Sequence, residues 1–144
     1  MSRVRTVLIG TTDRSPAADG GVLMLRVGLG LAMAFAHGLG KLPPSAGFVE
    51  NTADLGFPAP TLFAWLAALS EFAGGILVAV GLLTRPAALS LVATMAVAFF
   101  LQHGGDAFAD KELAFVYGVA FLGIALVGPG RYSVDAGLRR RWLG

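Results

Sequence analysis

The chain has 144 residues, of which 56% are hydrophobic and 14% are charged, and its mean hydropathy is +0.72. Soluble domains cover their surface with about 25–35% charged residues, so this composition excludes an ordinary soluble domain and predicts an integral membrane protein. The absence of cysteine excludes thiol exchange and cysteine-ligated zinc or iron–sulfur centres in this chain. No phosphate loop or nucleic-acid module is visible, so no nucleic-acid partner is predicted.

Four apolar stretches follow one another along the chain, each close to the roughly 20 residues needed to cross a hydrocarbon core. The predicted transmembrane helices are about 20–39, 61–83, 86–103 and 112–129. Because open strands cannot satisfy their backbone groups in lipid and the connections are short, the predicted fold is all-α, an up-down four-helix transmembrane bundle. The chain then divides into an N-terminal tail (1–19), a transmembrane domain (20–130) and a basic amphipathic tail (131–144).

Basic residues are divided unequally between the two ends of the predicted bundle. One end has only Lys41 and Lys111. The other end receives the arginines Arg3, Arg5, Arg14, Arg85, Arg131, Arg139, Arg140 and Arg141. Because cytoplasmic segments next to transmembrane helices are enriched in lysine and arginine, both termini are predicted to be cytoplasmic.

Two short helices are predicted outside the hydrocarbon core. Ser45 to Leu55 places apolar residues on one face and is followed by a proline-rich break, which predicts a surface helix. Ser133 to Leu143 sets an apolar stripe beside three arginines, a pattern typical of an interfacial helix on an anionic inner leaflet. Between the second and third apolar stretches, Thr84 is the predicted N-cap.

Three ionisable residues lie inside the predicted helices and form the predicted catalytic set. Arg26 and His37 are 11 residues apart, and at 100° per residue this spacing returns to within roughly 20° of one face, so both are predicted to face one neighbour. Glu71 lies near mid-membrane, where a charge costs roughly 2.5–3.5 kcal/mol on insertion scales and so suggests function.

Two pairings of Glu71 are open at this point. An Arg26–Glu71 ion pair would join the first two helices. Proximity of Glu71 to His37 is favoured because helical side chains lean toward their own N-terminus, which brings these two toward each other. Glu71 and His37 would then exchange protons, with Arg26 balancing the charge.

A wider polar cluster is predicted at the end of the bundle opposite the arginines. His103 ends the third helix and Glu112 begins the fourth, although for these two residues alone simple exposure to water is the favoured interpretation. The predicted binding residues are His37, Lys41, Glu71, His103 and Glu112. Tyr117 lies about 140° around its helix from Glu112 and is left out of the site. No metal site is predicted, and haem ligation by the two histidines is a disfavoured alternative.

Three stretches of the chain closely resemble the DoxX family of small prokaryotic membrane proteins. They are LRVGLGLAMAFAHGLGKL, GFPAPTLFAWLAALSEFAGGILVAVGLLTRPAAL and VGPGRYSVDAGL. The recurrent polar positions of the family fall on Arg26, His37, Lys41, Glu71 and Arg85, and the third-helix histidine falls on His103, where the surrounding loop is less similar to the family. The resemblance implies a four-helix, multi-pass protein of the cytoplasmic (inner) membrane. The family includes the DoxD-type subunit of a thiosulfate:quinone oxidoreductase and members linked to oxidative-stress defence through membrane complexes.

The favoured functional hypothesis is a redox-associated membrane protein that contacts a quinone or a small reducing substrate at an outward-facing polar pocket. Its partners would be the lipid bilayer and proteins of a redox complex, with a homo-oligomer left open. One alternative is a non-catalytic scaffold of a larger membrane complex. A transporter for a small solute is a further alternative, disfavoured because four helices enclose little room. Whether the chain is itself an enzyme is left open.

Overall fold

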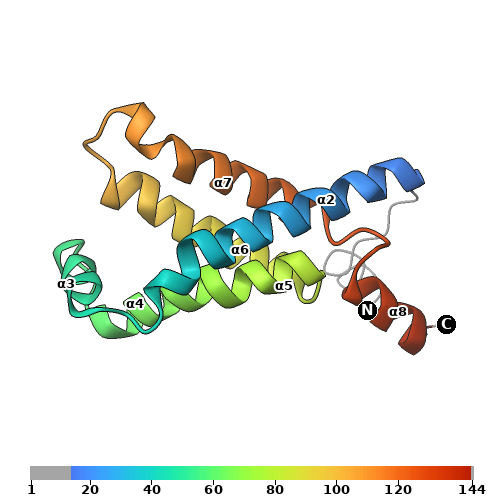
Figure 1. Ribbon diagram of the computed structural model, residues 1–144, viewed down its shortest axis with the longest axis horizontal. Helices are drawn as coiled ribbons and strands as arrows, with labels where there is room; N and C mark the ends of the chain where they lie inside the picture. Colours follow the sequence, from blue (N-terminus) through green and yellow to red (C-terminus); the bar gives the residue numbers. More distant parts are fainter. Residues whose placement is uncertain (1–13, 144) are drawn as a thin grey trace.

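The computed structural model describes residues 14–143. Arg3, Arg5 and most of the predicted N-terminal tail therefore lie outside the described residues. Within residues 14–143 the regular elements are all helical, which confirms the all-α prediction. Figure 1 shows long helices running beside one another, with the short helices α3 (Ala46–Asp54) and α8 (Val134–Leu143) at opposite ends.

The long helices are built from consecutive segments. The first consists of α2 (Pro16–Ala32), the π-helical segment η1 (Met33–Gly38) and the 3₁₀ turn η2 (Leu39–Lys41). The second consists of α4 (Pro60–Leu69), the π-helical segment η3 (Ser70–Gly74) and α5 (Gly75–Val80). The third consists of α6 (Thr84–Val97) and the π-helical segment η4 (Ala98–Gln102), and the fourth is α7 (Phe108–Val127).

Hydropathy separates these helices into two groups. Among the described residues, three helices are long and apolar enough to cross a membrane: Pro16–Lys41, Pro60–Val80 and Thr84–Gln102. Helix α7 has 20 residues but carries Asp110, Lys111 and Glu112 close to its start. The chain is therefore a membrane protein whose described part, residues 14–143, is all-helical and contains these three apolar helices.

The first two long helices pack with their backbones almost in contact. Gly38 lies so close to η3 that a Cβ atom there would be 2.4 Å from Phe72 N, and a Cβ on Gly75 would be 2.7 Å from Gly30 O. Gly38 lies against Phe72, whereas Gly30, earlier in the first helix, lies against Gly75, later in the second. The two helices therefore run antiparallel. Small residues at such positions let membrane helices approach closely, because little hydrophobic drive exists between helices in lipid.

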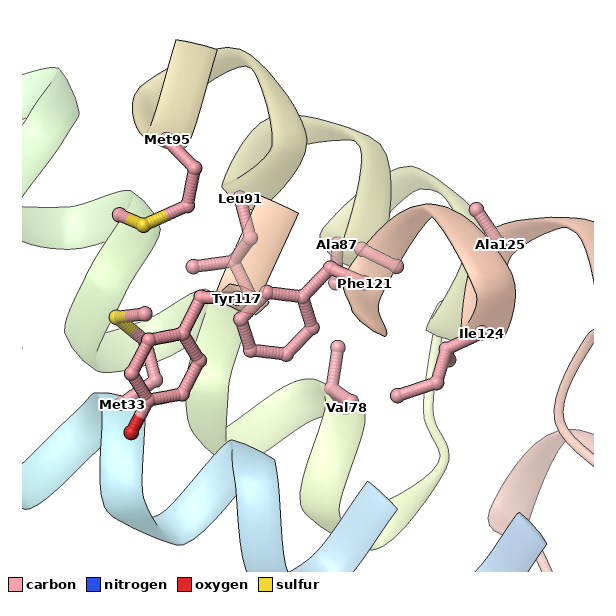
Figure 2. Close-up of a cluster of buried hydrophobic side chains, with 10 residues drawn as sticks. Met33, Val78, Ala87, Leu91, Met95, Tyr117, Phe121, Ile124 and Ala125 are labelled. Carbon is pink, nitrogen blue, oxygen red and sulfur yellow. The ribbon is translucent and has the colours of Figure 1, made fainter. Parts of the chain in front are cut away.

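The hydrophobic core lies where α2, α5, α6 and α7 meet (Figure 2). Phe121 and Leu91 are fully buried in it, and Tyr117 stacks on Phe121 with ring centroids 5.9 Å apart. The other members are Met33, Val78, Ala87, Ala88, Met95, Ile124 and Ala125. This core joins α7 to the three apolar helices.

Arg26 is completely buried near one end of this bundle and bonds to backbone carbonyls. Its Nη1 donates to Val78 O (3.1 Å) and Ala79 O (3.2 Å), and its Nη2 donates to Tyr132 O (2.6 Å). A cation at a helix C-terminus interacts favourably with the exposed carbonyls and with the helix dipole. Arg26 therefore fastens the end of α5 to the segment that leads into α8.

Asp135 of α8 caps the start of α6. Its carboxylate accepts hydrogen bonds from Leu83 N (2.9 Å), Thr84 N (3.0 Å) and Thr84 Oγ1 (2.9 Å). The prediction that Thr84 is the N-cap was wrong, because Thr84 is already helical and the residue before it, Leu83, has a φ of 48°. The capping oxygen comes from another helix, which the local sequence does not reveal.

We expect Asp135→Ala to lower stability by about 2 kcal/mol, because it leaves the first N–H groups of α6 without their acceptor. The melting temperature of the detergent-solubilised protein, followed by far-UV circular dichroism, measures this. Asp106→Ala is the control: Asp106 is 49% exposed and pairs with His103 at 2.8 Å at the protein surface, where an ion pair contributes about 0–1 kcal/mol. Equal losses in the two variants would refute the capping role.

Candidate functional site

A pocket of about 410 Å³ lies between α3, the second long helix and the third. Its wall combines apolar and aromatic side chains with polar ones, and its volume is in the range of small-molecule sites, roughly 300–1,000 Å³. The apolar lining consists of Phe48, Leu55, Phe57, Phe63, Leu66, Ala67, Ala93, Val97 and Ala98. The polar lining consists of Lys41, Asn51, Thr52, Ser70, Glu71, Ser90, Thr94 and Gln102.

Lys41 and Glu71 form an ion pair in the wall of this pocket. Lys41 Nζ donates to both carboxylate oxygens of Glu71, each at 2.7 Å. Glu71 is only 2% exposed, whereas the side chain of Lys41 is 36% exposed and lies 5.6 Å from the centre of the Phe48 ring. A buried charge is tolerated when it is paired and hydrogen bonded, so Lys41 is what allows an ionised Glu71 at this depth.

The structure therefore gives Glu71 a partner that neither open alternative named. Arg26 bonds to the carbonyls at the end of α5, and His37 packs against Tyr117, so the predicted Arg26–Glu71 and Glu71–His37 pairings are not the contacts formed. The expectation that Arg26 and His37 face one neighbour was also wrong. The π segment η1 begins between them and includes His37, and its i→i+5 bonding makes the turn wider, so the rotation of 100° per residue of an α-helix does not hold as far as His37.

His37 and Tyr117 lie edge to face, with ring centroids 5.5 Å apart and an interplanar angle of 79°. His37 is thus on the side of the first helix that faces α7, while the pocket lies on the side of Lys41. Neither His37 nor Tyr117 lines the pocket. Tyr117 had been left out of the site because of its angle to Glu112, and that angle says nothing about which helix it meets.

The two remaining predicted residues lie at the surface. His103 Nδ1 is 2.8 Å from Asp106 Oδ2, three residues further along, and Glu112 is exposed near the start of α7. Neither lines the pocket. Of the five predicted binding residues, the structure brings together Lys41 and Glu71.

Three hydroxyl groups in the pocket wall were not among the predicted site residues. Ser70 Oγ donates to Ser90 Oγ (3.1 Å), and Thr94 Oγ1 lies 3.1 Å from Ser70 Oγ. We call Ser70, Ser90 and Thr94 the hydroxyl row. Ser90 and Thr94 are one turn apart in the uncharged apolar stretch 86–102, and that spacing is the sequence signal that could have found them.

Helix α3 closes one side of the pocket. Ser45 caps its start by accepting from Phe48 N (3.2 Å), as expected for a helix predicted to begin there. Phe48 and Thr52 face inward, and Asn51 Nδ2 donates to Gln102 Oε1 (2.6 Å) at the end of η4. The surface helix is therefore part of the pocket wall.

These features define a small helical membrane protein with an ion pair and a hydroxyl row inside a largely apolar pocket. The chain belongs to the DoxX family, whose model matches residues 21–104. It is 34% identical to inner membrane protein YqjF of Escherichia coli over 86% of this chain and 96% of that protein. It is also 34% identical to inner membrane protein YphA of Escherichia coli, over 79% and 89% of the two chains.

A third relative is an uncharacterized membrane protein of Mycobacterium tuberculosis, 38% identical over 60% of this chain and 62% of that protein. No solved structure matches the chain. The family match, the names of the relatives and the three apolar helices together place the chain in the prokaryotic cytoplasmic (inner) membrane as a multi-pass protein.

Proposed function

We propose that this protein is a redox-associated subunit of the inner membrane that binds a quinone at the pocket next to Lys41 and Glu71. The observation that carries the proposal is a buried carboxylate, ion-paired with Lys41, in the wall of a pocket of about 410 Å³ that is lined by both apolar and polar side chains. An intramembrane ionisable residue that lines a cavity suggests a substrate or proton pathway.

The pocket suits an oxygen-bearing ring in its composition. Phe57 and Phe63 present rings with centroids 4.7 Å apart, and aromatic side chains pack well against a flat ring. Lys41 would donate a hydrogen bond to a ring oxygen, and Glu71 would accept or release a proton at its carboxylate. Interconversion of a quinone and its quinol moves two electrons and two protons. The electrons would pass to or from a partner enzyme or a small reducing substrate.

This proposal reduces the predicted catalytic set. Glu71 stays as the proton-handling group, and Lys41 takes the place of His37 as its partner. Arg26 is assigned to stabilising the fold, because its described hydrogen bonds go to three backbone carbonyls.

We also propose that α7 is a fourth membrane-spanning helix and that both termini are cytoplasmic. Helix α7 packs along α6 through the common core (Figure 2), and the charges at its start would lie at the outer surface. Arg14 and Arg85 donate to carbonyls at the end of α7, at the same end of the bundle as α8 and its arginines. By the positive-inside rule this end is cytoplasmic, so the pocket near Lys41 faces outward.

The test is the content of quinone in the purified protein. Wild type, Glu71→Gln and Glu112→Gln are purified in mild detergent and extracted into organic solvent, and quinone is quantified by mass spectrometry. Glu112→Gln is the matched control, since Glu112 is exposed and outside the pocket. We expect stoichiometric quinone in wild type and Glu112→Gln, and about tenfold less in Glu71→Gln, because Lys41 loses the carboxylate that holds its ammonium in place to donate to a ring oxygen.

Bulk lipid without quinone in all three proteins would refute the proposed function. An equal loss of quinone in Glu71→Gln and Glu112→Gln would refute the assignment of the site to Glu71. Circular dichroism of each variant establishes that it is folded before extraction.

A further inference from the structure

The three hydroxyl groups of the hydroxyl row donate their hydrogen bonds to acceptors within the protein. Ser90 Oγ donates to Ala87 O (2.8 Å), and Ser70 Oγ donates to Ser90 Oγ (3.1 Å). Thr94 Oγ1 has two acceptors within reach, Ser90 O (3.0 Å) and Ser70 Oγ (3.1 Å), and its single proton serves one of them. Because each hydroxyl carries one proton and two lone pairs, and each proton has an acceptor in the protein, the row mainly offers a ligand lone pairs.

The ion pair offers mainly acceptors as well. Each Glu71 oxygen accepts one hydrogen bond from Lys41 and keeps lone-pair capacity for another. The Lys41 ammonium commits two of its three protons to Glu71 and has one left to donate. Further donors in the wall are the amides of Asn51 and Gln102, which hydrogen bond to each other between α3 and η4.

A quinone and its reduced form differ in what they present to such a wall. The two carbonyl oxygens of a quinone only accept hydrogen bonds, so opposite the hydroxyl row or Glu71 they would meet other acceptors. The two hydroxyl groups of a quinol donate as well as accept. A buried polar group without a partner is costly, so the hydroxyl row and Glu71 favour the form that can donate to them.

We propose that the pocket selects the reduced form, a membrane quinol, with one ring hydroxyl donating to the hydroxyl row or Glu71. This inference rests on the proposed function, because it names which form of the same ligand the site prefers. The remaining N–H of the Lys41 ammonium donates a hydrogen bond to a quinol oxygen. The site would then hold the quinol until a partner enzyme accepts its two electrons and its two protons are released.

The experiment compares two forms of one probe under anaerobic conditions. A decyl-substituted benzoquinone and the hydroquinone made from it are titrated into the detergent-solubilised protein by isothermal calorimetry. We expect the hydroquinone to bind about tenfold more tightly than the quinone, the effect of one or two satisfied hydrogen bonds.

Thr94→Val tests the hydroxyl row at nearly constant side-chain volume. We expect it to weaken hydroquinone binding about fivefold and to reduce the difference in affinity between the two forms, since the quinone gains nothing from this oxygen. Thr61→Val, on α4 and outside the pocket, is the control and should leave both affinities unchanged.

The possible failures are distinguishable. Equal affinities, or tighter binding of the quinone, in wild type would overturn the preference and leave quinone binding itself standing. Equal weakening of both forms by Thr94→Val would overturn the role of the row. Binding of neither form would overturn the proposed function and this inference with it.

Discussion

Gly38→Ala is expected to destabilise the protein by about 2–3 kcal/mol, the range of an overpacked core site. The added Cβ would lie 2.4 Å from Phe72 N, 2.6 Å from Phe72 Cα and 2.7 Å from the carbonyl carbon of Glu71. These are backbone atoms and cannot rotate away, so the first two long helices must separate. The pocket beside Glu71 would be displaced with them. The melting temperature in detergent measures the loss.

Gly28→Ala is the matched control for this prediction. Gly28 lies in the same long helix, and a Cβ there would have nothing within 4 Å. Alanine is the better helix former by about 0.8–1.0 kcal/mol, so this variant should melt at the wild-type temperature or above. Although both variants replace glycine by alanine, Gly38→Ala should therefore melt at a much lower temperature than Gly28→Ala. If Gly38→Ala melts with Gly28→Ala, the close contact is not a determinant of the fold.

Arg26→Met should lower stability by about 3 kcal/mol, because it removes a fully buried cation and the donors of three hydrogen bonds while keeping most of the volume. Val78 O keeps a second donor, Gly81 N at 3.2 Å. Ala79 O and Tyr132 O lose the guanidinium, so the larger part of the cost comes from these two carbonyls. The same melting measurement applies, and the junction between α5 and α8 should open first.

Arg85→Met provides the comparison for Arg26. Arg85 Nη2 reaches Leu126 O at 3.3 Å in an exposed hydrogen bond, and the side chain is only half-buried. Its loss should cost about 1 kcal/mol or less. Arg26→Lys, which keeps the charge but lacks the fork of donors, should fall between Arg26→Met and wild type. A melting temperature of Arg26→Met equal to that of Arg85→Met would contradict the fastening role of Arg26.

The candidate site was predictable in part. Glu71 stands out as the carboxylate in the middle of an apolar helix, and the structure places it at a pocket. Lys41 was among the predicted binding residues, and the argument that brought His37 toward Glu71 applies equally to Lys41, four residues further along. The α-helical period misplaced His37, because η1, which contains it, is not α-helical.

The sequence by itself determined the membrane environment, the all-helical structure and the surface helix α3. These properties depend on residues that are close together in the sequence: the hydropathy of about 20 consecutive residues, and the capping residue at the start of a helix. The tertiary structure alone decided that Lys41 pairs with Glu71, that Asp135 caps α6, and that Ser70 meets Ser90 and Thr94. Each of these contacts joins different helices, and a π segment departs from the rotation of 100° per residue of an α-helix, enough to change the helix that a side chain meets.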